Sequence, residues 1–332
     1  MKTIRWGILG CGKIARKFAS DLKFVKDARL IAVAAREQIN ADVFAMEFQV
    51  PVAYGNYDAL VNNSEVDVIY IATPHSHHYE HVKRCLKNRK AVLCEKAFTI
   101  NLREAIELVE LARKEKVFLM EAFWTRFLPH YSKAKEMIAG GKIGSIKFIN
   151  AEFGFKPTPP IAPRMFDPAL GGGSLLDVGV YPVFLALDML GKPDQIQASM
   201  VAASSGVDEQ CSIQFRYDNG AMANLFSSFA SNLATGADIA GDSGRLRMTH
   251  RFHGPTTQLE YYPGIVDSRE QIDFEKAKGN GYEYEAQHVT DCLQNGLSES
   301  PLRTLDDTLL LMEVLDQIRL KAGIHYPIND VV

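Results

Sequence analysis

Cysteine is scarce in this chain of 332 residues, and charge of neither sign dominates. The five cysteines are scattered, odd in number and form no CxxC pair, which excludes a disulfide scaffold and indicates reduced thiols in the cytoplasm. The 37 basic and 40 acidic residues nearly balance, so no basic excess exists to hold a nucleic acid. No apolar run approaches the roughly 18 residues of a membrane span, and the first residues do not resemble a signal peptide. We therefore expect neither a nucleic-acid partner nor a membrane.

What is present is the composition of a globular protein, with 47% hydrophobic and 23% charged residues. The length favours two domains. In the first 124 residues, short runs rich in Val, Ile and Leu alternate with helical patterns, which predicts βαβ units and a doubly wound parallel sheet of the Rossmann type. The expected strands are Ile4–Leu9, Leu30–Ala34, Val66–Ala72, Ala91–Cys94 and Phe118–Ala122, and the expected helices are Ala15–Phe24, Ala41–Phe48, His78–Asn88 and Leu102–Lys116.

The pattern changes after Trp124, where strand-like segments follow one another with hairpin turns between them. We expect residues 125–332 to form an α+β domain with a large, mostly antiparallel open sheet, and residues 1–124 to form the dinucleotide-binding domain. The expected strands are Ile146–Phe155, Ile196–Ala203, Glu209–Tyr217, Ala221–Ser228, Arg245–Arg251 and Gln258–Tyr262, and the expected helices are Tyr131–Ala139, Leu175–Leu190, Tyr284–Asn295 and Leu305–Lys321.

A glycine-rich turn follows the first expected strand and opens the first expected helix. Gly10 permits the tight turn, Gly12 lets the backbone approach a pyrophosphate, and Ala15 lets the helix pack closely on the strand. Free N–H groups at the helix start suit an anion. The turn therefore predicts dinucleotide binding by residues Gly10, Gly12, Lys13, Ile14 and Ala15.

The second expected strand ends at Ala35, and Arg36 follows where an NAD site usually has an acidic residue. A guanidinium can form paired hydrogen bonds with the 2′-phosphate of NADP. We therefore predict that Ala35 and Arg36 bind the cofactor and that NADP(H) is preferred, while NAD(H) stays possible.

Histidines crowd the segment after the third long strand, from His75 to His81. A metal site is one interpretation, because His77 and His81 are four residues apart on an expected helix. No carboxylate or cysteine stands at the spacing of a known metal signature, so we expect no metal. The preferred interpretation is that this turn lies behind the nicotinamide ribose while the other histidines lie on a solvated helix face. The residues expected to bind cofactor here are Thr73, Pro74, His75 and His78.

Two further groups have reactive side chains. Glu95 and Lys96 close an expected strand, where a lysine can donate to a developing alkoxide or lower the pKa of a neighbouring acid. The alternative is an ordinary solvated pair. Asp177 and Tyr181 are four residues apart in an expected helix and would share one face; the alternative is a capping Asp and a core Tyr. A phenol, a carboxylate and a lysine form a workable set for proton transfer.

Taken together, these motifs resemble the glucose–fructose oxidoreductase/inositol dehydrogenase (Gfo/Idh/MocA) family along the whole chain, including Tyr284-Glu285-Ala286. Two departures stand out: Ala97 replaces the proline that often follows Glu-Lys, and Tyr181 replaces a histidine common in sugar dehydrogenases. Tyr181 and the segments 94–96, 121–127 and 151–154 resemble the branch of dimeric dihydrodiol dehydrogenases and NADP-dependent D-xylose dehydrogenases. The motifs that carry the family resemblance are Gly10-x-Gly12-x-x-Ala15, Thr73-Pro74 with His78, Glu95-Lys96 and Asp177-Val178-Gly179-Val180-Tyr181.

The resemblance implies an NADP(H)-dependent oxidoreductase acting on the CH–OH or carbonyl carbon of a sugar such as D-xylose or D-glucose, or of a trans-dihydrodiol. It implies Tyr181 as general acid/base, Lys96 as the group that lowers the pKa of Tyr181, and Asp177 as an orienting group. It also implies a homodimer formed through the second sheet. The expected cofactor residues extend to Glu95, Lys96, Trp124 and Arg126, and the expected substrate residues are Phe153, Arg164, Asp177 and Tyr181.

Two alternatives of other classes stay open. One is a non-catalytic NADPH-binding regulator of the same fold, against which the retention of Lys96, Asp177 and Tyr181 counts. The other is a metalloenzyme that uses the histidine cluster.

Overall fold

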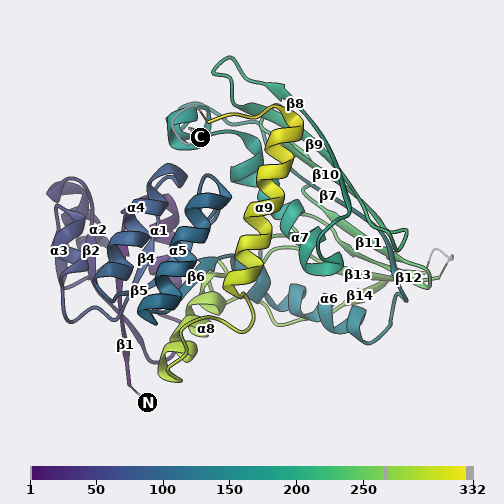
Figure 1. Ribbon diagram of the computed structural model, residues 1–332. Coiled ribbons are helices and arrows are strands. Elements are labelled where there is room, and N and C mark those ends of the chain that lie inside the picture. Colours follow the sequence, from purple (N-terminus) through teal and green to yellow (C-terminus); the bar gives the residue numbers. More distant parts are fainter. Residues whose placement is uncertain (1, 265–267, 327–332) are drawn as a thin grey trace. The chain divides into compact units, whose positions relative to one another are not determined.

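The computed structural model describes residues 2–264 and 268–326. The chain divides into two compact units (Figure 1). The first comprises Met1–Phe127 and Ala277–Leu309, and the second comprises Leu128–Lys276 and Leu310–Val332. The expected division at 124/125 falls close to the first crossing, but a single cut misses the return of the chain to the first unit after residue 276.

The first unit contains a parallel sheet of six strands in the order β3-β2-β1-β4-β5-β6. This order is that of a Rossmann sheet and confirms the expected fold class. The central strands are apolar, apart from Arg5 near the start of β1, because helices cover both faces of such a sheet. The strands are β1 (Ile4–Leu9), β2 (Ala28–Ala34), β3 (Val52–Tyr54), β4 (Val68–Ile71), β5 (Ala91–Glu95) and β6 (Leu119–Ala122).

The helices of the first unit agree with the sequence pattern in the long elements and differ in the short ones. The pattern did not predict β3 or α3, because three and five residues are too few to show a period. Asn56 begins α3 by accepting a hydrogen bond from the Ala59 amide at 2.8 Å. The helices are α1 (Lys13–Leu22), α2 (Gln38–Phe48), α3 (Tyr57–Val61), α4 (His78–Lys87), α5 (Leu102–Glu115) and α8 (Tyr282–Gln294).

Helix α8 belongs to the first unit, although the sequence placed it in the second domain. Its apolar face, including Ala286 and Val289, joins the core around Trp6 and Phe18. The fully buried Asp21 of α1 accepts hydrogen bonds from backbone amides of the segment that leads into α8. No local pattern contains this information, because the partners are about 260 residues apart.

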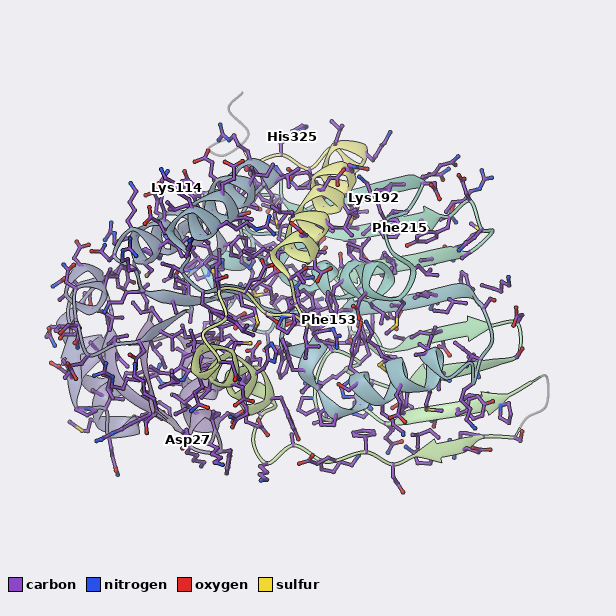
Figure 2. The ribbon with its side chains drawn as sticks, turned by 60° about the horizontal axis from the view of Figure 1, so that its bottom comes forward. Asp27, Lys114, Phe153, Lys192, Phe215 and His325 are labelled. Atoms are coloured by element: carbon purple, nitrogen blue, oxygen red, sulfur yellow. The ribbon has the colours of Figure 1, made fainter. Side chains whose placement is uncertain are left out.

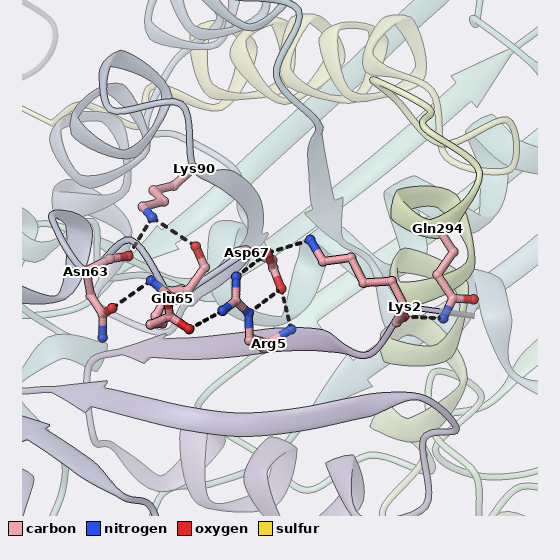
Figure 3. A network of polar contacts seen from close by, with 8 residues as sticks. Lys2, Arg5, Asn63, Glu65, Asp67, Lys90 and Gln294 are labelled. Atoms are coloured by element: carbon pink, nitrogen blue, oxygen red, sulfur yellow. Dashed lines mark hydrogen bonds and ion pairs between the residues drawn. The ribbon is translucent and has the colours of Figure 1, made fainter.

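A network of polar contacts fixes the position of the amino end of β1 (Figure 3). Arg5 and Lys2 both contact Asp67 at 3.0 Å, and Gln294 of α8 donates to the Lys2 carbonyl at 2.8 Å. Burial acts to raise the pKa of Asp67, but its hydrogen bonds with Arg5 and Lys2 outweigh that effect and the pKa is lowered. The network lies at the end of the sheet opposite to the carboxyl edge, where ligands of such folds bind.

The second unit contains an eight-stranded sheet in the order β14-β13-β12-β11-β7-β10-β9-β8. Only β7 and β10 pair in parallel, so the expected large, mostly antiparallel sheet is confirmed. Figure 2 marks Phe153 on β7 and Phe215 on β9 of this sheet. The strands are β7 (Ile146–Gly154), β8 (Gln195–Ala202), β9 (Asp208–Arg216), β10 (Met222–Ser228), β11 (Ala237–Gly241), β12 (Gly244–Met248), β13 (Leu259–Pro263) and β14 (Glu270–Ile272). The short strands β11 and β14 were not predicted.

Helix α7 (Val180–Leu190) packs against β7 and β10, and α6 (Pro129–Ala139) precedes the sheet. The expected single helix Leu175–Leu190 is in fact a π-helical turn, Leu175–Gly179, followed by α7. The last helix, α9, spans Leu305–Ala322.

One segment corrects the expectation that no apolar run is long enough for a membrane span. Pro168–Leu190 has the required length and a mean hydropathy of 1.5. However, 94% of this apolar stretch is buried inside the protein. A core helix of a globular domain has the same property, so the segment is weak evidence for a membrane span.

Candidate active site

The turn between β1 and α1 has the geometry that its glycines predict. Gly10 has φ +99° and donates to the Ala34 carbonyl at 2.9 Å. A Cβ atom at Gly10 would lie 3.0 Å from the Ala72 carbonyl oxygen, whereas a Cβ at Gly12 would meet no atom within 4 Å. The absence of a side chain at Gly12 therefore leaves space for a ligand and is not needed to avoid a clash within the protein. Helix α1 starts there without a side-chain cap or an acidic residue in its first turn, which leaves its N–H groups available to a pyrophosphate.

Arg36 lies just beyond the end of β2, at the same edge of the sheet. The Ala35 amide donates to the Tyr54 carbonyl at 3.0 Å, which fixes the backbone before Arg36. The Arg36 side chain is exposed, and within residues 2–264 and 268–326 no carboxylate forms an ion pair with it. An exposed guanidinium without a carboxylate partner is suited to an anionic ligand.

His78 has a structural position that the sequence did not reveal. Its two ring nitrogens lie 2.8 Å from the Thr73 carbonyl oxygen and 3.0 Å from that of Ala97, so it joins the turn after β4 to the turn after Lys96. Burial lowers the pKa of His78 to about 4. His78 is therefore neutral near pH 7, and its single N–H donates to one of these two carbonyl oxygens. The Lys96–Ala97 peptide bond in the second of these turns is cis.

The expectation that the other histidines lie on a solvated helix face is wrong for His81. This residue is buried, and its Nδ1 atom lies 3.1 Å from the Thr73 hydroxyl. Burial, with smaller effects of neighbouring cations, lowers the pKa of His81 to about 3. His75 is also buried, whereas His77 is exposed. In the part of the chain that the structure describes, no three His, Cys, Asp or Glu side chains are placed to share a metal ion.

Glu95 is enclosed rather than paired with Lys96 in solvent. The hydroxyl of Tyr70 donates to its carboxylate, and burial raises the pKa of Glu95 although Lys96 acts to lower it. Glu285 of α8 is also fully buried, and within the described residues neither of its carboxylate oxygens has a hydrogen-bond partner. Burial raises the pKa of Glu285, and the negative charge of Glu95 adds a smaller effect in the same direction. The first unit thus holds two interacting acids, the partly buried Glu95 next to Lys96 and the fully buried Glu285, whose pKa values burial raises.

Trp124 and Arg126 form part of a short 3-10 helix, Trp124–Phe127, directly after β6. The indole of Trp124 stacks on Tyr282 at 4.5 Å between ring centroids. The sequence identified Trp124 but not Tyr282, because the two are joined only by the return of the chain to the first unit.

The second unit holds Arg164, Asp177, Tyr181 and Phe153, the expected substrate residues. Asp177 lies in the π-helical turn, and its carboxylate forms an ion pair with Arg164 at 3.3 Å. Tyr181 lies in the first turn of α7, buried, with its ring 5.7 Å from that of Phe153. The structure therefore brings these four residues together as two pairs within one unit.

A third ring completes the wall beside Tyr181 and was missed by the sequence analysis. His253 stacks on Phe153 with centroids 4.2 Å apart and an interplanar angle of 18°, and it lies 4.7 Å from Tyr181. The residue follows β12 in an irregular segment. No motif or periodic pattern surrounds it, so only the three-dimensional packing identifies it.

The turn before Tyr181 is held by buried polar residues. Ser174 donates to Asp208 at 2.8 Å, and the same carboxylate accepts from the Leu175 backbone amide at 2.6 Å. Burial raises the pKa of Asp208 to about 6, although the hydrogen bonds oppose that effect. Tyr326 also donates to the Gly172 carbonyl at 2.7 Å. These contacts position the glycine-rich segment and hence the start of the π-helical turn.

Comparison with known families agrees with this arrangement. Residues 4–123 match the Gfo/Idh/MocA oxidoreductase family with an NAD-binding Rossmann fold, and residues 131–247 match the C-terminal domain of the same family. The chain belongs to the Gfo/Idh/MocA family of oxidoreductases. The family resemblance found in the sequence motifs is therefore confirmed.

Curated members of the Gfo/Idh/MocA family match the chain over nearly its whole length. The trans-1,2-dihydrobenzene-1,2-diol dehydrogenase of Xenopus tropicalis is 36% identical over 331 residues, covering 97% of this chain and 99% of that protein. The enzyme of the same name from Mus musculus is 36% identical, with 98% of each chain covered. These relatives support the branch of the family that the motifs indicated.

Solved structures of similar fold agree as well. A 3-ketoreductase from Actinomadura kijaniata, in complex with NADP and TDP-benzene, superposes with a TM-score of 0.87, 26% identity and coverage of 97% of this chain and 98% of that one. An aldose-aldose oxidoreductase from Caulobacter crescentus reaches a TM-score of 0.88 at 22% identity over 97% and 98% of the two chains, which supports the fold alone.

Proposed function

We propose that this protein is an NADP(H)-dependent dehydrogenase or reductase. It transfers a hydride between nicotinamide and a CH–OH or carbonyl carbon of a trans-dihydrodiol or of a sugar such as D-xylose or D-glucose. The observation that carries the proposal is the phenol of Tyr181, which lies against the rings of Phe153 and His253 in a chain related over nearly its full length to dihydrodiol dehydrogenases.

The preference for NADP(H) rests on Arg36. Its guanidinium is exposed and lacks a carboxylate partner among the described residues, and it follows the strand beside the open turn at Gly12. The 3-ketoreductase of similar fold was solved with NADP. The other expected cofactor residues at this edge are Lys13, Ile14, Ala15, Thr73, Pro74, His75, Glu95, Trp124 and Arg126.

In the proposed mechanism, Tyr181 of the second unit transfers the proton and Lys96 of the first unit stabilises the resulting charge. When bound, the nicotinamide ring supplies the hydride acceptor for oxidation or the hydride donor for reduction. In oxidation, the Tyr181 oxygen takes the proton of the substrate hydroxyl while the hydride leaves the same carbon, so an alcohol yields a carbonyl compound and one proton. Lys96 stabilises the tyrosinate, and Asp177 orients the substrate or Tyr181.

In the 3-ketoreductase of similar fold, a tyrosine and a lysine have been replaced in solved variants. One of them replaces a tyrosine with phenylalanine, and others replace a lysine with alanine or glutamate. In the present chain, Tyr181 and Lys96 are residues of the same two types.

We further propose a cytoplasmic homodimer that forms through the outer face of the second sheet. Phe148 and Met222 are directly opposite each other on the paired strands β7 and β10, and both are exposed. Adjacent apolar residues on a solvent-facing sheet are suited to a protein interface. The molar mass in solution, measured by light scattering, tests this point: a monomer at micromolar concentration contradicts it.

The experiment that tests the proposed function measures NADP⁺ reduction by absorbance across aldoses, inositols and trans-dihydrodiols, with NAD⁺ in parallel. NADPH oxidation with dicarbonyl compounds covers the opposite direction. We expect turnover with NADP⁺ preferred, and loss of turnover in the Lys96→Met variant. Binding of NADPH without turnover of any compound in either direction would favour the non-catalytic regulator. Activity that disappears after chelation would favour the metalloenzyme.

A further inference from the structure

We propose that His77 is a second binding residue for the 2′-phosphate of the cofactor, beside Arg36, and that it makes the binding of this phosphate dependent on pH. The inference rests on the proposed use of NADP(H). It goes further by naming a residue and a proton-linked form of recognition that the motifs did not predict.

The first observation is the topology around His77. Strands β3, β2, β1 and β4 are neighbours in the parallel sheet, so their carboxyl ends lie along one edge. Four side chains follow these ends: Tyr57 follows β3, Arg36 follows β2, Cys11 follows β1 and His77 follows β4. The turn of Gly12, where the pyrophosphate is expected, lies on the same edge, so a ribose phosphate has these four side chains as its surroundings.

The second observation is a series of ring contacts that links β4 to β3. Tyr57 lies edge-on to His81, with centroids 4.8 Å apart, and His81 lies 5.9 Å from His77. His81 is fixed by its contact with the Thr73 hydroxyl at 3.1 Å, and its strongly lowered pKa keeps it neutral. His77 is therefore the exposed member of this series, and its ring is free to accept a proton when an anion binds.

The third observation is the balance of charge. Two effects lower the pKa of His77: partial burial is the larger, and the positive charge of the nearby Arg36 is the smaller. Neither residue forms an ion pair with a carboxylate in the described ranges of the chain. The two exposed side chains thus form a site where an anion can bind, since no carboxylate of the described chain is paired with either of them.

Among the described residues, the other titratable groups nearby form no ion pair with Arg36 or His77. Burial raises the pKa of Cys11 to about 11, and burial also raises the pKa of Tyr57, so both are neutral near pH 7. Asp58 of α3 is paired with Arg84 of α4 at 2.9 Å. Glu37 lies next to Arg36 in the sequence, but its carboxylate accepts from the side-chain amide of Asn40 at 3.2 Å instead of pairing with Arg36.

These observations give a direction for the effect of pH. In the free protein, His77 is neutral at pH 7, because its pKa is below the ordinary value of 6.5. A bound phosphate dianion favours the protonated ring, so the pKa rises and His77 takes up a proton on binding. The 2′-hydroxyl of NAD has no charge and produces no such uptake. Arg36 stays charged at every accessible pH, and its contribution does not change.

The test compares proton uptake in the wild-type protein and in the His77→Gln variant. Each full-length protein is titrated with NADP⁺ and with NAD⁺ by calorimetry at pH 7, in two buffers of different ionisation enthalpy. The 2′-phosphate itself has a pKa near 6 and loses some proton on binding beside Arg36. Because this loss is common to both proteins, the difference between them reports His77.

We expect the wild-type protein to take up more protons with NADP⁺ than His77→Gln does, by up to about half a proton per cofactor at pH 7. The variant should bind NADP⁺ about 2- to 5-fold more weakly at pH 6.5 and equally well at pH 9, as a pKa rise of about one unit requires. NAD⁺ affinity should not change. His250→Gln removes an exposed histidine of the second unit and serves as the matched control.

Equal proton uptake in the wild-type protein and in His77→Gln overturns the inference. If Arg36→Gln nevertheless weakens NADP⁺ and spares NAD⁺, the proposed cofactor preference survives that failure. Equal affinity of the wild-type protein for NADP⁺ and NAD⁺ contradicts the cofactor preference itself, and the role of His77 fails with it. Because His77 is exposed, we expect the variant to fold, and an unchanged melting temperature verifies this.

Discussion

The two units hold their candidate residues in different ways. In the first unit, the candidates follow the carboxyl ends of neighbouring parallel strands, so each belongs to a short motif that is continuous in the sequence. In the second, Phe153 lies on β7, Tyr181 on α7 and His253 in an irregular segment after β12, and they meet only through packing. Backbone geometry therefore builds one site and side-chain contacts build the other.

This difference has a physical origin. A phosphate is bound by backbone N–H groups and by a charge at the end of a strand, which local sequence can specify. A substrate wall needs rings at defined distances, and many sequences can place rings from distant segments together. Substitutions should therefore separate the functions of the two units. The predictions below run from the largest expected effect to the smallest.

The largest effect concerns the segment that returns to the first unit. Arg303 forms a buried ion pair with Glu121 of β6, and the two side chains are 4% and 0% exposed. Arg303→Met leaves the Glu121 carboxylate buried without its cation, and we expect it to cost about 3–5 kcal/mol of unfolding free energy in urea denaturation. Replacing both residues by Met should recover most of this loss.

A matched control is a second ion pair between this segment and the first 127 residues. Arg113 pairs with Asp306 at 2.8 Å, but both side chains are largely exposed, so Arg113→Met should cost no more than about 1 kcal/mol. Equal effects of Arg303→Met and Arg113→Met would show that the buried Arg303–Glu121 pair stabilises the first unit no more than an exposed pair does.

The next effect separates two glycines of one turn. Gly12→Ala introduces a methyl group into open space in the free protein, so we expect an unchanged melting temperature. Its affinity for NADPH should fall about 10- to 100-fold, because the methyl group holds the pyrophosphate away from the backbone and weakens charge-assisted hydrogen bonds. Fluorescence titration with NADPH measures this loss.

Gly10→Ala should behave differently from Gly12→Ala. Its backbone has φ +99°, which an alanine adopts at a cost of about 1–2 kcal/mol. Both stability and affinity should fall, and thermal unfolding distinguishes the two variants. A Gly12→Ala protein that binds NADPH normally would show that the pyrophosphate lies elsewhere.

The sequence predicted the first unit better than the second for the same physical reason. The Gly10–Ala15 turn, the long strands and Arg36 follow from local patterns, and the structure places them as expected. Three features did not follow: the Tyr70–Glu95 hydrogen bond, the buried Glu285 and the position of α8. Each depends on a contact between distant segments, which local periodicity does not contain.

In the second unit, the sheet and the position of Tyr181 were predictable from strand alternation and from a motif. The π-helical turn at Leu175–Gly179 was not, because a helical pattern in an apolar segment does not distinguish i→i+4 from i→i+5 bonding. His253 had no signal of any kind. Its role as a ring between Phe153 and Tyr181 is a product of packing alone.

The smallest effect tests this ring. His253→Ala removes the stack on Phe153, and we expect kcat/KM to fall about 3- to 10-fold, since a ring pair contributes about 0.5–1.5 kcal/mol. His253→Phe keeps the stack and should restore most of the loss. NADPH affinity should stay constant in both variants, because His253 belongs to the second unit. Unchanged kcat/KM in His253→Ala would exclude this ring from the substrate wall.

The most direct test of the separation between the two units is the Tyr181→Phe variant, measured for NADP⁺ affinity and for turnover side by side. The account predicts an affinity within about twofold of the wild-type value and a kcat lower by about 10²–10⁴-fold, because only the proton-transfer group is lost. Wild-type turnover in this variant would contradict the assignment of the proton to Tyr181. Loss of NADP⁺ binding in a folded variant would contradict the separation of cofactor binding from proton transfer.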